Sequence, residues 1–264
     1  MFAGGKGALL NLKPVGIVFL ALVAGTAHAQ DAPKNLKYFP KDITRPELIS
    51  RMRQFSFALG VPCTHCHGTA EQTTFDLTGV DFSTDLKPQK AKARDMLRMT
   101  DEINTKLLAP MQHSELNLKV TCFTCHSGLA LPESIEARVL RTVKSGGAKA
   151  AVEDYRKTRE QYFGSAAYNF KEQPLVEVAS MLRDGGQLDA AVEISKLNLE
   201  FYPDSGQSKF GLAEAYFGLG DTKNARPLYE AMLKARPGAK NIQARLEEID
   251  RIEREAAEKK GTVP

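Results

Sequence analysis

The sequence predicts an all-α protein made of two different helical modules. Apolar residues recur at intervals of three and four over residues 44–59 and 88–108, which is the spacing of one face of an α-helix. Beyond residue 170, similar residues recur 34 positions apart, which is typical of stacked helix pairs. Of the 264 residues, 42% are hydrophobic and 26% are charged, which excludes disordered, collagen-like and polytopic membrane proteins.

The first 29 residues predict a secretory signal peptide. They hold Lys6 and Lys13 but no acidic residue, then an apolar run over residues 15–24 and the small-x-small sequence AHA at residues 27–29. That run is about half of the ~20 apolar residues that a membrane span needs. We therefore expect export to the periplasm, cleavage before Gln30 and no transmembrane span in the mature chain. Removal of the two lysines lowers the formal net charge from +4 to +2, which indicates no nucleic-acid partner.

A polar N-terminal arm over residues 30–43 precedes the first predicted helix. Thr44 and Glu47 have the spacing of a capping box, which marks a helix start. Gly60 and Pro62 mark its end, because glycine caps helices and proline cannot continue them. The apolar stripe between these signals consists of Leu48, Met52, Phe55 and Leu59.

A second helix is predicted over residues 88–108, after a loop rich in Thr, Gly and Asp at residues 68–86. Its apolar stripe, expected to face inward, consists of Met96, Met99, Ile103 and Leu107. The outer face is basic and carries Lys90, Lys92, Arg94 and Arg98. Such a face is usually only solvated, and the alternative is that it steers an acidic partner.

Each methionine-bearing helix is followed by a Cys-x-x-Cys-His motif: CTHCH at residues 63–67 and CFTCH at residues 122–126. This pattern is an attachment site for c-type haem, because two thiols on one helical turn reach the two vinyl groups and the next histidine faces the iron. We therefore expect two covalently bound haem c groups, with His67 and His126 as iron ligands. The thioether residues are Cys63, Cys66, Cys122 and Cys125, which are all the cysteines of the chain.

Other uses of the four cysteines explain less of the pattern. A zinc site made of four thiolates leaves two matching histidines without a role. A redox dithiol belongs near a βαβ pattern, which this sequence lacks. A disulfide between cysteines only three positions apart is strained and closes almost no loop.

The sixth ligand of each iron decides whether a haem only transfers electrons or also binds a small molecule. Met52 is the one methionine of the mature chain that precedes the first motif, and it lies on the apolar stripe. It is therefore the candidate for the first haem. For the second haem, Met96 and Met99 lie on the second stripe, and Met111 and His113 lie in the loop that follows. Methionines at helical spacing are usually core residues, so the haem motifs carry these assignments.

Segments around both motifs resemble the cytochrome c subunit of photosynthetic reaction centres. They are FALGV at residues 57–61, ARDMLRM at residues 93–99 and VTCFTCH at residues 120–126, and the similarity covers about residues 44–132. That family binds four haems in two similar halves and feeds electrons to an oxidised pigment pair. The resemblance implies that this chain has one half, with two haems.

The resemblance also implies a set of axial ligands. Met52 matches the axial methionine of the first haem, and Met96 matches that of the second. His113 lies near the place where the family has a histidine that reaches a haem of the other half. A homo-oligomer that shares haem ligands is therefore an open alternative.

Residues 133–264 predict a helical-repeat domain after the dihaem domain at residues 44–132. The 34-residue period and the small and aromatic residue types resemble tetratricopeptide repeats. A generic helical bundle is the alternative. Residues 134–166 are expected to form an irregular helix pair, and residues 241–258 a terminal cap. The pairs 34 residues apart are Val178 and Leu212, Ala179 and Ala213, Leu182 and Tyr216, Gly186 and Gly220, Ala191 and Ala225, and Pro203 and Pro237.

These features together favour an electron carrier over an enzyme. The expected partner is a redox protein, either a membrane complex or another cytochrome, docked through the repeats. One alternative is a dihaem enzyme of the peroxidase type, which needs one haem without a sixth protein ligand. Another is an assembly factor in which the repeats act and the haem is structural.

Overall fold

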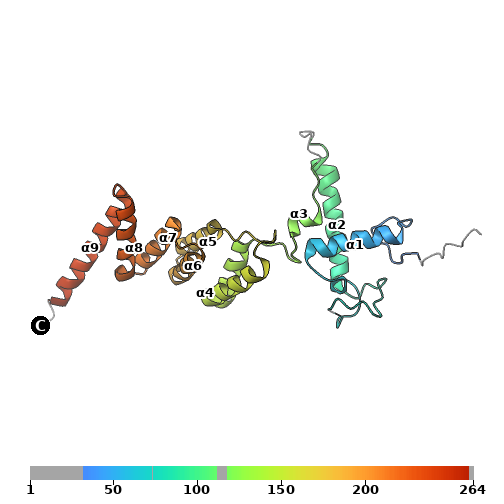
Figure 1. Ribbon diagram of the computed structural model, residues 1–264, viewed down its shortest axis with the longest axis horizontal. Helices are drawn as coiled ribbons and strands as arrows, with labels where there is room; N and C mark the ends of the chain where they lie inside the picture. Colours follow the sequence, from blue (N-terminus) through green and yellow to red (C-terminus); the bar gives the residue numbers. More distant parts are fainter. Residues whose placement is uncertain (1–31, 73, 112–117, 262–264) are drawn as a thin grey trace, which may run out of the picture.

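The computed structural model describes residues 32–72, 74–111 and 118–261, and in these ranges the regular structure is helical throughout, as predicted. Figure 1 shows helices α1, α2 and α3 at one end of the molecule and helices α4 to α9 at the other. The first group contains α1 (Arg45–Leu59), η1 (Cys63–His65), α2 (Pro88–Glu102), η2 (Ile103–Leu108) and α3 (Cys122–His126). The second group contains α4 (Ile135–Tyr162), α5 (Glu172–Asp184), α6 (Leu188–Phe201), α7 (Gly206–Gly218), α8 (Thr222–Ala235) and α9 (Lys240–Gly261).

Helix α1 has the predicted start and end. The Glu47 backbone amide donates to the Thr44 hydroxyl at 3.4 Å, and the Thr44 amide donates to the Glu47 carboxylate at 3.1 Å. Two otherwise unpaired backbone donors are satisfied in this way. Gly60 ends the helix in the left-handed conformation at φ 65°. The residues of the predicted apolar stripe are all half-buried.

The second helix is α2 followed directly by a π-helical segment, η2, and together they fill the predicted range. Three members of the predicted apolar stripe of this helix are not buried by other parts of the protein. Met96 is 44% exposed, Met99 is 45% exposed and Leu107 is 61% exposed. The reason is that α2 makes no extensive contact with a described helix other than its own continuation η2, so helix packing does not cover the stripe.

Helix α4 bends sharply at Gly147, whose φ of 81° and ψ of 173° lie outside the helical region. The bend divides α4 into two helical arms, which agrees with the irregular helix pair expected over residues 134–166. Only glycine adopts such a conformation without strain. The arms pack on α5 and α6, where Tyr155, Leu175 and Ile194 are fully buried in one apolar core.

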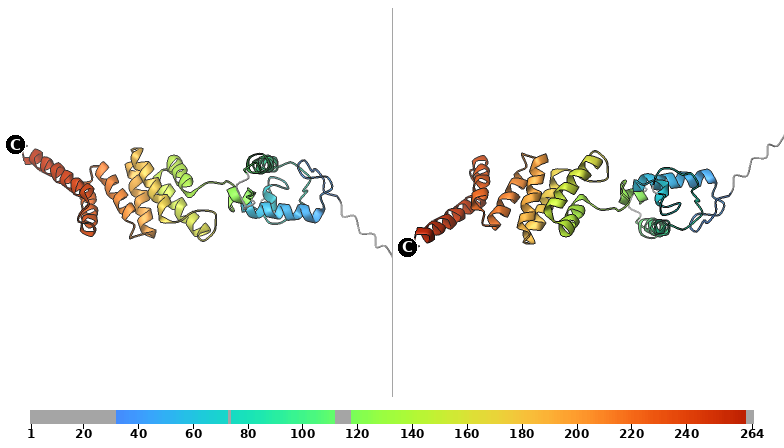
Figure 2. Two further views of the ribbon diagram at one scale, coloured as in Figure 1. Left: turned by 90° about the horizontal axis from the view of Figure 1, so that it is seen from above. Right: turned by 90° about the horizontal axis from the view of Figure 1, so that it is seen from below.

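Helices α5 to α8 alternate in direction and stack side by side, as the two views of Figure 2 show. Residues 34 positions apart have matching roles in the two helix pairs. Val178 and Leu212 are both buried, and Gly186 and Gly220 follow the first helix of each pair at φ 76° and 74°. The identity of these pairs as tetratricopeptide repeats stays a prediction.

Helix α9 covers the end of the stack. Ile242 and Ile249 of α9 are buried against Tyr229 of α8 in a second apolar cluster. In the described part of the chain, no helix is both long enough and apolar enough to span a membrane. The predicted signal peptide lies outside the described residues.

Candidate haem-binding site

The first Cys-x-x-Cys-His motif forms a tight turn directly after α1. The backbone amides of Cys66 and His67 both donate to the Cys63 carbonyl, at 3.2 and 3.1 Å. Cys63 begins the short 3₁₀ segment and Cys66 is its C-terminal cap, and both cysteine residues are half-buried. The Thr64 side chain is fully buried, and its hydroxyl donates to the Thr74 carbonyl, which ties the motif to the following loop.

His67 is buried against the loop that precedes α2. The residue is 9% exposed, and its ring centroid lies 5.1 Å from that of Phe82. Burial, assisted by the nearby Lys90 cation, lowers the pKa of His67, so the imidazole is neutral and able to bind a metal. Its Nδ1 atom is buried and has no hydrogen-bond partner.

The second motif is helix α3 itself. Thr121 and Thr124 cap its first turn, with the Thr124 amide donating to the Thr121 hydroxyl at 3.3 Å. The Nδ1 atom of His126 lies 2.7 Å from the Leu129 carbonyl oxygen. A carbonyl oxygen only accepts, so Nδ1 carries the proton and Nε2 keeps a lone pair for a metal.

The two motifs adjoin each other in space. The Gly128 amide donates to the Ala58 carbonyl at 2.9 Å, and the rings of Phe57 and Phe123 stack with centroids 5.4 Å apart. The approach requires glycine at position 60, since a Cβ there would lie 2.1 Å from the Gly128 carbonyl oxygen. The residues just before the first motif thus contact the residues of and just after the second.

The segment that leads into the second motif is held by η2. The Asn104 side-chain Nδ2 donates to the Val120 carbonyl at 2.8 Å, and the Val120 backbone amide donates to the Asn104 side-chain Oδ1 at 2.8 Å. The paired hydrogen bonds fix the position of residue 120, two residues before Cys122.

In the N-terminal arm, Tyr38 donates to Asp101 near the end of α2. Burial and this hydrogen bond raise the pKa of Tyr38 to about 12.

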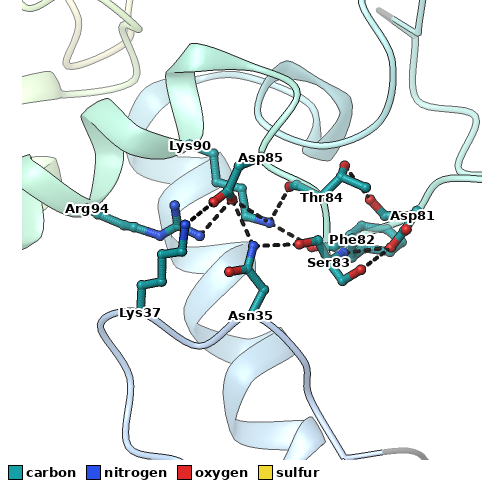
Figure 3. Close-up of polar contacts among 9 residues, drawn as sticks. All are labelled: Asn35, Lys37, Asp81, Phe82, Ser83, Thr84, Asp85, Lys90 and Arg94. Carbon is teal, nitrogen blue, oxygen red and sulfur yellow. Dashed lines mark hydrogen bonds and ion pairs between the residues drawn. The ribbon is translucent and has the colours of Figure 1, made fainter.

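A cluster of charges around Asp85 joins the arm, the loop and α2 (Figure 3). The Asp85 carboxylate lies 2.7 Å from Lys37, 2.8 Å from Arg94 and 3.4 Å from Lys90. Hydrogen bonds from Arg94 and Lys37 hold the pKa of Asp85 well below its usual range. Lys90 also donates to the Phe82 carbonyl at 2.8 Å, so the cluster positions the ring that covers His67.

The candidate sixth ligands lie on both helices that precede the motifs. Met52 is half-buried on α1, and Met96 and Met99 are exposed on α2. Met111 is exposed after η2, and His113 lies outside the described residues. The assignment of Met52 and Met96 to the irons stays a prediction.

The donor set of these residues fits haem c. All four cysteines are free thiols, two in each short turn, and each turn ends in a histidine. Among the described residues, no three potential metal-binding side chains converge, so the thiols do not form one zinc site. Nδ1 of His67 is buried without a hydrogen-bond partner, and Nε2 of His126 keeps a lone pair because Nδ1 carries the proton. Both observations are compatible with histidines that bind iron.

Sequence reasoning found the motif residues but missed the groups that position them. Lys87 is buried and donates to the carbonyls of Thr64 and Gln72, and Asn104 binds Val120. Both are polar residues, and no local sequence pattern marks them for these roles. Gly60 was recognised only as a helix stop. Its contact with Gly128 spans 68 positions of sequence and has no local signal.

Comparison with known proteins confirms the predicted relationship. Residues 71–187 match the family model of the photosynthetic reaction centre cytochrome C subunit. The match contains the second motif but not the first, which ends at His67. It continues beyond the predicted limit at residue 132 and ends just after α5. It supports a c-type cytochrome with covalently bound haem c.

A cytochrome c-554 from Chloroflexus aurantiacus (strain ATCC 29366 / DSM 635 / J-10-fl) is 34% identical over 91 residues. These residues are 34% of this chain and 19% of that protein, so the matched part spans about a fifth of the relative.

Proposed function

We propose that this protein is an exported dihaem c-type cytochrome that carries single electrons to or from a redox protein. Residues 44–132 form the dihaem domain, and residues 133–264 form a repeat domain that docks the partner. Cys63 and Cys66 hold one haem c, and Cys122 and Cys125 hold the other. When bound, each haem supplies a one-electron couple.

The contact between the two motifs is the observation that carries this proposal. The hydrogen bond from Gly128 to Ala58 and the stacked rings of Phe57 and Phe123 hold the two attachment turns next to each other. Two redox groups held this close by one chain favour exchange of electrons between them. A chain that used haem only as a structural staple has no need for such a contact.

The chain's own residues hold and orient the two groups. Burial keeps His67 neutral. The Leu129 carbonyl oxygen accepts a hydrogen bond from Nδ1 of His126, and this bond orients the ring so that Nε2 points away from Leu129. Met52 and Met96 complete the coordination, with Met99 and His113 as the alternatives for the second haem. Because all ligands come from the protein, no position is left for a substrate.

The position of the repeats supports a docking role. Their helices surround two apolar cores, and they lie at the opposite end of the molecule from α1 and α2 (Figure 1). A partner bound on α5 to α8 therefore leaves the motif region accessible. Stacked helix pairs commonly present such extended surfaces to proteins.

The test is quantitation of haem in the full chain, expressed in a host that matures c-type cytochromes and recovered from its periplasm. We expect two covalent haems per chain by pyridine haemochrome, a far-red band from methionine ligation and no binding of carbon monoxide by the reduced protein. Carbon monoxide bound at one haem favours the peroxidase-type alternative. A colourless or zinc-containing protein contradicts the proposal.

A further inference from the structure

Lys87 is a buried cation attached to the first motif. The residue is 9% exposed, and its Nζ atom donates to the Thr64 carbonyl at 2.5 Å and to the Gln72 carbonyl at 2.6 Å. Both acceptors are neutral, and among the described residues no carboxylate forms an ion pair with this ammonium group. The Lys87 side chain is thus held at the first motif by two carbonyl oxygens and without an ionic partner, although burial of such a group is costly.

Further positive charge surrounds the same motif. Lys90 and Arg94 of α2 share the Asp85 carboxylate with Lys37. Asp81 adds a second negative charge near Lys90, and Glu71 adds a third near Lys87. Four cations therefore face three carboxylates, and the excess is positive.

The second motif is held by neutral groups instead. Its described contacts are the capping hydroxyl of Thr121, the Leu129 carbonyl, the ring of Phe57 and the Ala58 carbonyl that receives Gly128. The two sites have the same Cys-x-x-Cys-His sequence pattern but different electrostatic surroundings. A fixed positive charge stabilises the reduced form of a redox group, which carries one more electron than the oxidised form.

We propose that Lys87 is a positioning residue that holds the first motif and makes it the site of higher reduction potential. This inference rests on the proposed dihaem function. One electron leaves the group at the second motif, which is oxidised, and arrives at the group at the first motif, which is reduced. No bond forms or breaks, and the electron rests at the first motif before it leaves the protein.

The experiment is a spectroscopic redox titration of the full-length holoprotein and of three variants. Lys87→Met removes the charge, Lys87→Arg keeps it, and Lys92→Met removes a charge from an exposed position of the same helix. In Lys87→Met we expect the higher midpoint potential to fall and the lower one to stay. The equilibrium between the two sites changes at least tenfold, which is ~59 mV for one electron. Lys87→Arg and Lys92→Met change the gap much less.

Several results overturn the inference. The inference is wrong if only the lower midpoint potential falls, if both potentials fall equally or if neither changes. It is also wrong if Lys87→Arg lowers the higher potential as much as Lys87→Met does, because charge is then not the cause. If Lys87→Met does not mature, Lys90→Gln tests the same field, and a smaller fall in the same higher potential is expected. Haem content is measured first: a chain without two haems contradicts the proposed function, whereas a fully loaded chain with unshifted potentials contradicts this inference alone.

Discussion

The motif region and the repeat region differ in where their apolar side chains lie. In α4 to α9 the large apolar residues fill two buried cores. Between residues 32 and 131 the buried apolar residues of the described chain are only Ala58 and Leu129, while Phe57 is 74% exposed and Leu86 is 68% exposed. The repeat region is therefore stabilised by burial, whereas the motif region depends on hydrogen bonds, ion pairs and, under the proposed function, the apolar faces of its haems.

Leu129 is the residue that connects the two regions. Its side chain belongs to the apolar core of α4 to α7, and its carbonyl accepts the hydrogen bond from His126. The orientation of one proposed iron ligand thus depends on a residue anchored in the repeat region.

Loss of one haem is expected to have the largest effect. It also tests whether the motif region and the repeat region unfold independently. In a Cys122→Ser, Cys125→Ser double variant we expect haem content to fall from two to one per chain, since no thiol remains for attachment at the second motif. The motif region, which buries little of its own apolar surface, loses protection against proteolysis. Melting of the repeat helices, followed by far-ultraviolet circular dichroism, stays within about 0.5 kcal/mol of the parent. A joint loss shows that the regions form one cooperative unit.

Local sequence rules were sufficient wherever the structure is set by neighbours in sequence. The Thr44 and Glu47 capping box, the Gly60 stop and the glycines after α5 and α7 all follow from local backbone requirements. The motif cysteines and histidines can also be identified from the sequence, because haem attachment requires their fixed spacing.

The remaining features depend on contacts between distant residues. Met96 and Met99 are exposed although they lie on an apolar stripe, because helical periodicity predicts a stripe but not what covers it. The burial of Lys87 depends on the carbonyls of Thr64 and Gln72, which the chain brings together only after the loop has folded back. Neither the composition nor the periodicity of the sequence indicates such a contact.

Truncation of a core residue in the repeat region is expected to have the next largest effect. Leu175 of α5 is fully buried, so Leu175→Ala destabilises the repeats by about 2–5 kcal/mol through lost burial and a cavity. Met181 on the same helix is 56% exposed, and Met181→Ala is the matched control with an effect below about 0.5 kcal/mol. Chemical denaturation gives both values, and haem absorbance reports the motif region separately. Equal effects of the two substitutions contradict the burial argument.

A smaller effect is expected at the contact between the motifs. Gly60→Ala requires a side chain at φ 65° and pushes a Cβ against the Gly128 carbonyl, so we expect a loss of about 2–4 kcal/mol in the motif region. Gly79 has a similar φ of 69° but open space around it, so Gly79→Ala has only the conformational penalty of about 1–2 kcal/mol. Thermal melting of the haem absorbance measures both. If the control costs as much as Gly60→Ala, close approach of the motifs is not what position 60 requires.

The smallest effect concerns charge in the repeat region, where Glu214 accepts from Arg245 at 2.8 and 2.9 Å and from Tyr229 at 2.6 Å. Burial raises the pKa of Glu214, but the hydrogen bonds from Arg245 and Tyr229 outweigh burial and leave that pKa lowered. A carboxyl whose pKa is lower in the folded state stabilises the fold above its unfolded pKa of about 4.3. This contribution is lost as pH falls through the lower, folded pKa.

Glu214→Gln is therefore expected to cost about 1.5–3 kcal/mol at pH 7 and progressively less as the pH is lowered below about 4. The measurement is denaturation of the repeat helices at a series of pH values, with Glu193→Gln as the control. Glu193 lies on the surface of α6 in an exposed pair with Lys196, and such pairs contribute little. A pH-independent loss in Glu214→Gln means that shape, and not charge, makes Glu214 important. The repeat region is then stabilised by packing alone, and its contrast with the charge-anchored motif region becomes sharper.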